Sequence, residues 1–79
     1  MQERIREVLA AHGRMAVDPH TIEDQADLYE LGLTSHASVN VMLALESEFG
    51  VEFPDEMLNR SMFISVAAIE AALRRAASA

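Results

Sequence analysis

Two segments repeat apolar residues along one helical face, which predicts an amphipathic helix near each end of the chain. The first, over residues 2–12, is followed by Gly13 as a stop. Its apolar face recurs at i, i+3, i+4 and i+7: Ile5, Val8, Leu9 and His12. The second, over residues 66–77, follows Ser65, a favoured N-cap residue. Its face recurs at i, i+3 and i+7: Val66, Ile69 and Leu73. Its C-terminal end carries the positive charge favoured there: Arg74 and Arg75.

A third helix, over residues 36–49 and stopped by Gly50, has more apolar positions than one buried face requires. One row would dock it on the rest of the protein: Ser38, Val41, Met42, Leu45 and Phe49. A second row lies behind Ser35 on the other side: His36, Val39, Asn40 and Leu43. The second row is either core, because small bundles bury wide faces, or an apolar surface strip that binds a protein.

The remaining segments are irregular or short. Residues 14–34 contain the turn signal Asp18-Pro19, and a helical turn is expected over about 25–31. Apolar residues could anchor this loop on the core: Ile22, Leu28, Tyr29 and Leu31. Pro54 suits the first turn of a short helix over 54–60. The predicted fold is therefore all-α: a four-helix bundle of three longer helices and one short helix, in a single domain covering residues 1–79.

Charge is distributed unevenly along the chain. The formal net charge is −7, yet residues 15–59 hold ten acids and no Lys or Arg, for a formal charge of −10. The remainder of the chain carries +3. An acidic middle argues against nucleic acid as a partner, because phosphate binding needs a basic surface. It favours a basic protein partner, unless the acids only maintain solubility.

Composition excludes several other classes. The chain has no cysteine, so disulfides and thiolate metal sites are ruled out. Its histidines lack metal-ligand spacing, so no metal site is expected: His12, His20 and His36. No apolar run reaches the length of a membrane span, and the N-terminus does not resemble a secretory signal. We expect a cytoplasmic monomer.

Ser35 is the candidate for chemistry. Taken locally, Thr34-Ser35 before a helix is typical of an N-cap, with Ser35 as the capping residue. A hydroxyl at a helix N-terminus is also well placed to carry a phosphate, and Gly32 would allow a tight turn that leaves it accessible. A hydrolase is disfavoured, because neighbouring helical side chains point about 100° apart and His36 is therefore not poised as a base for Ser35.

The stretch DLYELGLTSHASVNVMLALESEFGVEFPDEML resembles the prosthetic-group attachment region of acyl carrier proteins and their aminoacyl and peptidyl relatives. The segment FISVAAIEAAL resembles the last helix of that family, so the resemblance covers nearly the whole chain. It implies that Ser35 receives 4′-phosphopantetheine from coenzyme A through a phosphopantetheinyl transferase. The thiol of that arm would hold an acyl or aminoacyl cargo as a thioester, and the carrier itself would perform no turnover.

The resemblance also implies partners and a docking surface. The partners would be the transferase, an acyl- or aminoacyl-loading ligase and downstream transferases. Docking would use the helix after the serine: Thr34, His36, Val39, Asn40, Leu43 and Glu46.

Two residues depart from the family pattern. Thr34 replaces an aspartate and His36 replaces a leucine, which favours a specialised free-standing carrier over the housekeeping fatty-acid carrier. The cargo stays open between an acyl chain and an amino acid loaded by a discrete ligase. An unmodified interaction module on the same fold is the alternative of another class.

Overall fold

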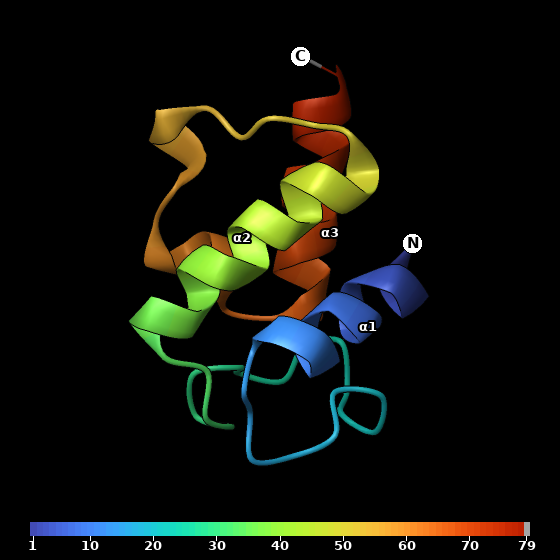
Figure 1. Cartoon of the computed structure of the whole chain (residues 1–79), viewed down its shortest axis with the longest axis vertical. Helices are drawn as coiled ribbons and strands as arrows, with labels where there is room; N and C mark the ends of the chain where they lie inside the picture. The colour runs from blue at the N-terminus through green and yellow to red at the C-terminus, as the bar shows by residue number, and fades with distance from the viewer. Residues whose placement is uncertain (79) are drawn as a thin grey trace.

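The computed structural model describes residues 1–78 and contains three α-helices around one core (Figure 1). They are α1 (Gln2–His12), α2 (Ser35–Phe49) and α3 (Val66–Ser78). Two short 3₁₀ helices, η1 (Asp55–Met57) and η2 (Arg60–Phe63), lie between α2 and α3. No strand occurs in this described part of the chain, so the all-α prediction is confirmed and the three longer helices lie where they were expected.

The predicted short helix over 54–60 is wrong, because two 3₁₀ turns replace it. Leu58 and Asn59 leave the helical region, and Asn59 is extended at φ −141° and ψ 172°. The Asn59 side chain then accepts a hydrogen bond from the Met62 amide at 3.2 Å, so it caps the second turn. Asn59, a polar N-cap residue, therefore splits this segment, and the first 3₁₀ turn begins at Asp55 with Pro54 as its N-cap residue.

The core lies where the faces of all three helices meet. Its largest fully buried side chains come from these helices and from one loop residue: Ile5, Leu9, Leu28, Val41, Leu45, Val66, Ile69 and Leu73. The predicted faces of the first and last helices are confirmed except at His12, which is exposed at the end of α1. The Ser65 cap is also confirmed, because its hydroxyl accepts a hydrogen bond from the Ala68 amide at 3.1 Å.

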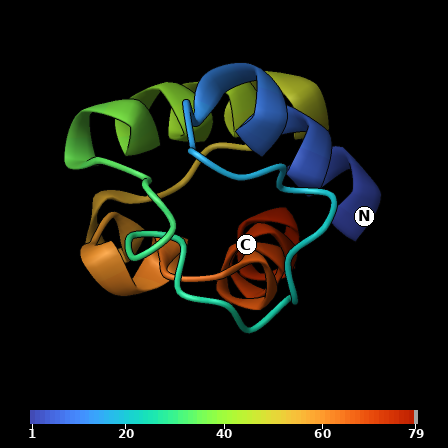
Figure 2. The same cartoon turned by 90° about the horizontal axis from the view of Figure 1, so that it is seen from below.

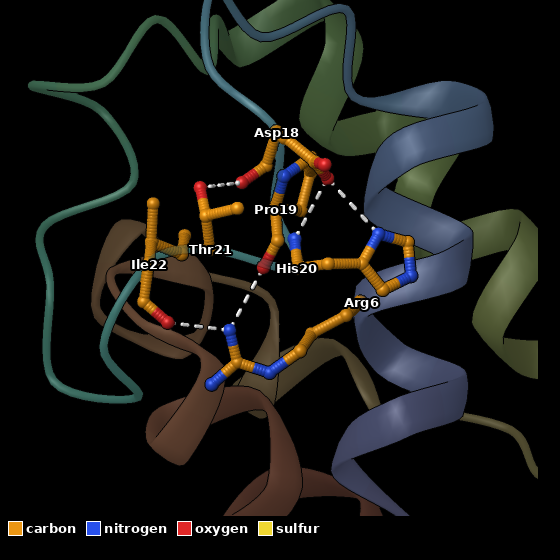
Figure 3. Close-up of polar contacts among 6 residues, drawn as sticks. All are labelled: Arg6, Asp18, Pro19, His20, Thr21 and Ile22. Atoms are coloured by element: carbon orange, nitrogen blue, oxygen red, sulfur yellow. Dashed lines mark hydrogen bonds and ion pairs between the residues drawn. The ribbon is translucent and has the colours of Figure 1, made fainter.

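The 14–34 loop is held to α1 by one arginine (Figure 3). The Arg6 guanidinium donates to the carbonyls of Pro19, at 2.8 Å, and Ile22, at 2.6 Å. The Asp18 carboxylate accepts bonds from the His20 amide at 2.9 Å and pairs with its ring Nδ1 at 3.0 Å. These bonds to His20 lower the pKa of Asp18 below its ordinary value. These hydrogen bonds therefore fix the path of the 14–34 loop.

The second half of the loop is fastened to the start of α3. The Leu28 amide donates to the Ile64 carbonyl at 2.8 Å, and the Ala67 amide donates to the Asp24 carbonyl at 2.9 Å. Leu28 is fully buried, as expected for an anchor. The helical turn expected over 25–31 is present only as hydrogen-bonded turns, which end at Leu33. The loop therefore delivers residue 34 to a fixed point on the core.

Candidate functional site

The N-terminus of α2 is built by a glycine turn and a threonine cap. Gly32 has φ +113°, a conformation that L side chains rarely adopt, and a Cβ there would lie 3.2 Å from the Ala16 amide nitrogen. Thr34 is extended, and its hydroxyl accepts a hydrogen bond from the Ala37 amide at 3.0 Å. The assignment of the cap to Ser35 is therefore wrong: Thr34 is the cap and Ser35 is the first helical residue.

Ser35 is left exposed with its hydroxyl free. Within residues 1–78 its Oγ makes no hydrogen bond, while its carbonyl accepts one from the Ser38 hydroxyl at 2.7 Å. The amides of Ser35 and His36 also donate to no described group, since Thr34 caps only the Ala37 amide. Two free amides and the helix dipole favour an anion on this hydroxyl. The residues present therefore fit a phosphodiester at Ser35.

A groove of about 320 Å³ opens beside Ser35, between α2 and the η1–η2 segment. Figures 1 and 2 show this segment running alongside the first turns of α2. The groove has mostly apolar walls, and its lining residues are Tyr29, Ser35, Ser38, Val39, Met42, Leu58, Asn59, Arg60 and Phe63. The Arg60 guanidinium lies 4.0 Å above the Tyr29 ring, a cation–π contact that joins the loop to η2. An extended arm from Ser35 would have an apolar channel next to its point of attachment.

The second apolar row of α2 is on the surface. Val39 is 51% exposed and Leu43 is 54% exposed, whereas Val41 and Leu45 are fully buried. His36 and Asn40 are exposed on the same side. The core interpretation of this row is therefore wrong, and the strip beside Ser35 is open to a partner.

Glu46 has a structural task that the sequence did not indicate. Its Oε2 accepts a hydrogen bond from the Phe53 amide at 2.9 Å and so fixes the chain after Gly50. Glu48 forms an ion pair with Arg4 of α1 at 3.0 Å, and the same guanidinium lies over the Phe49 ring. The sequence gives little indication of this role, because the hydrogen bond joins Glu46 to a residue seven positions later, beyond the C-terminal end of α2. Both α2 acids are thus bound to their own chain.

Among residues 1–78, no group of three or more His, Cys, Asp or Glu side chains gathers closely enough to hold a metal ion. None of the helices in this part of the chain has the length and apolar character needed to cross a membrane.

With this geometry in place, comparison with known proteins defines the class. Residues 3–73 match the family described as the phosphopantetheine attachment site. The chain therefore belongs to this family of phosphopantetheine-dependent carrier proteins. Its cofactor is 4′-phosphopantetheine and its role is that of a carrier.

Particular relatives narrow the class further. An aminoacyl carrier protein of Agrobacterium fabrum is 51% identical over 70 residues, which are 89% of this chain and 84% of the relative. An engineered Bradyrhizobium japonicum glycine:[carrier protein] ligase has been crystallised with a carrier protein from Agrobacterium tumefaciens and AMP. A chain of that crystal superposes with a TM-score of 0.91 at 49% identity, covering 94% of this chain and 99% of that one. A similar Bradyrhizobium ligase complex, with a glycylated carrier protein, matches at a TM-score of 0.76 and 31% identity, covering 90% and 95%.

Proposed function

We propose that 4′-phosphopantetheine is attached to Ser35 and that the cargo on its thiol is an amino acid. The observation that carries the first part is the exposed, unbonded Ser35 hydroxyl at the first turn of α2, beside two free amides. The similarity to an aminoacyl carrier protein supports the second part. The bound group supplies a thiol that holds the cargo as a thioester.

In this proposal, each residue of the α2 N-terminus has a separate task. Thr34 holds the first turn in place, Ser35 forms the phosphodiester, and the amides of Ser35 and His36 face its negative charge. The groove at Ser38 and Met42 would accommodate the arm between deliveries. In this proposal the chain holds and delivers the cargo, and its partner enzymes carry out the chemistry.

The loading partner in this proposal is a discrete amino acid:[carrier protein] ligase, and glycine is the first cargo to test. Crystal structures of such a ligase in complex with a carrier protein contain a chain that is similar to this one. A phosphopantetheinyl transferase would act first and downstream transferases last. We place the protein in the cytoplasm, because coenzyme A and ATP-dependent loading are available there. We further propose that it is a monomer with a single domain.

Intact-mass measurement tests both parts in sequence. Incubation with coenzyme A and a broad-specificity transferase should add one phosphopantetheinyl group to the wild type and to Ser47→Ala, and none to Ser35→Ala. Ser47 is the matched control, because it is an exposed serine of the same helix. Addition of the ligase, ATP and glycine should then add one glycyl group. An unmodified wild type would favour the interaction module, and a modified chain that accepts only acyl groups would overturn the aminoacyl cargo.

A further inference from the structure

Val39 and Leu43 form a ridge with a groove on each side. The groove that contains Ser35 lies toward η1 and η2, and it includes Val39. A second groove of about 340 Å³ lies toward the end of α1, and its lining residues are Ala11, His12, Arg14, Asn40, Leu43 and Ala44. In Figure 1, α1 lies on one side of α2 and the η1–η2 segment lies on the other. A partner seated on the ridge would therefore reach both grooves.

Among residues 1–78, no carboxylate side chain lines either groove, although the chain contains thirteen Asp and Glu residues and only six arginines. Each groove instead contains one arginine: Arg60 on the η2 side and Arg14 on the α1 side. Within residues 1–78 neither arginine forms an ion pair, and Arg60 only stacks on Tyr29. The charged side chains that line the two grooves are therefore basic, although the protein as a whole is acidic.

The acids of α2 do not reverse this pattern. The helix has two, Glu46 and Glu48, and both lie in its last turn. Glu46 bonds to the Phe53 amide and Glu48 pairs with Arg4, so both are already engaged by the scaffold. The exposed residues from Ser35 to Leu43 carry no formal charge when His36 is neutral. Attraction at the ridge thus comes from apolar area and from two flanking guanidinium groups.

We propose that a docking face, made of His36, Val39, Asn40 and Leu43 and flanked by Arg14 and Arg60, takes a ligase surface that is apolar at its centre and bears carboxylates at its edge. This sign is opposite to the one that the acidic net charge predicts. The inference rests on the proposed function, because the partner is the ligase that loads the arm. Complementary charges at an interface rim act mainly on association and on the choice of partner.

The probe is the engineered Bradyrhizobium glycine:[carrier protein] ligase, with the phosphopantetheinylated chain as substrate. Asn40→Asp and Asn40→Lys place opposite charges at one exposed position of the docking face. We expect kcat/KM for glycylation to fall by about threefold to tenfold for Asn40→Asp and to stay level or rise for Asn40→Lys. Arg14→Glu should lower it by about tenfold. Matched controls on α3, namely Ala71→Asp, Ala71→Lys and Arg75→Glu, should remain within about twofold of the wild type.

The proposal is overturned if kcat/KM is higher for Asn40→Asp than for Asn40→Lys. It is also overturned if kcat/KM changes neither with the charge at Asn40 nor in Arg14→Glu. The affinity of the unmodified chain for the ligase, measured by titration calorimetry, separates this result from failure of the proposed function. If Ser35 is never modified, glycylation is lost in the wild type, but the sign test at Asn40 can still be made on binding. A wild-type chain that binds the ligase in neither form counts against the docking face.

Discussion

The two apolar faces of α2 have the same kind of residue but opposite surroundings. On one face Val41 and Leu45 are fully buried, and on the other Val39 and Leu43 are about half exposed. The charged side chains also differ between the docking face and the rest of the protein. Away from the docking face the ion pairs join parts of the scaffold, as between Arg4 and Glu48, whereas Arg14 and Arg60 have no carboxylate partner in residues 1–78. One helix thus contributes its first face to stability and leaves its second available for binding.

The largest effect that separates the two faces is on stability. Leu45→Ala removes a fully buried side chain and should lower the free energy of unfolding by about 2–5 kcal/mol. Leu43→Ala, the same change two residues earlier, should alter it by no more than about 0.5 kcal/mol. Urea denaturation of both variants measures this difference. Equal destabilisation would mean that Leu43 also packs in the core, and the contrast between the faces would be lost.

Much of this arrangement was predictable from sequence, because helical periodicity reports local geometry. The buried faces that contain Ile5, Leu9 and Ile69 were identified from spacing alone, since α1 and α3 each have one dominant apolar stripe. Spacing also found both rows of α2. It did not show that Val39 and Leu43 are exposed, because that depends on which other elements cover the helix, and no local pattern contains that information.

The errors at the ends of elements have a common physical cause. Thr34 and Ser35 are both good capping residues, and the choice between them is made by the tertiary path of the loop that Gly32 turns. The structural role of Glu46 was missed for the same reason, because its carboxylate bonds to the Phe53 amide beyond the end of the helix, while its predicted role in docking stays a prediction. Side chains that satisfy backbone groups at a terminus are selected by geometry that forms only after the chain folds.

The second prediction concerns the separate roles of Thr34, which caps α2, and Ser35, which is proposed to be modified. Thr34→Ala removes the hydroxyl that accepts the Ala37 amide, so it should cost about 1 kcal/mol of stability while Ser35 can still be modified. Ser35→Ala should abolish modification and change stability by no more than about 0.5 kcal/mol. Thermal denaturation and intact mass, read on the same samples, check this. Thr34→Ser is the control that keeps a hydroxyl cap, and it should resemble the wild type in both measurements.

The smallest expected effect concerns the acids that belong to the scaffold. The Glu70 carboxylate accepts bonds from Arg74 at 2.7 Å and from Gln2 at 2.8 Å, and these bonds lower its pKa below the ordinary value of 4.5. A carboxyl whose pKa is lower in the folded state binds fewer protons there than in the unfolded chain. Its stabilising contribution is therefore present above about pH 4.5 and is lost as the pH falls through the folded-state pKa.

Glu70→Gln should accordingly lose less stability than the wild type when the pH is lowered from about 5 to about 3. Glu7→Gln, at an exposed acid of α1 that forms no ion pair in residues 1–78, is the control and should follow the wild type. Urea midpoints at several pH values measure the slopes. Because Glu70 lies on the scaffold and the docking face has no carboxylate, ligase affinity at neutral pH should be the same for both variants. An affinity change confined to Glu70→Gln would show that the scaffold acids and the docking face are not independent.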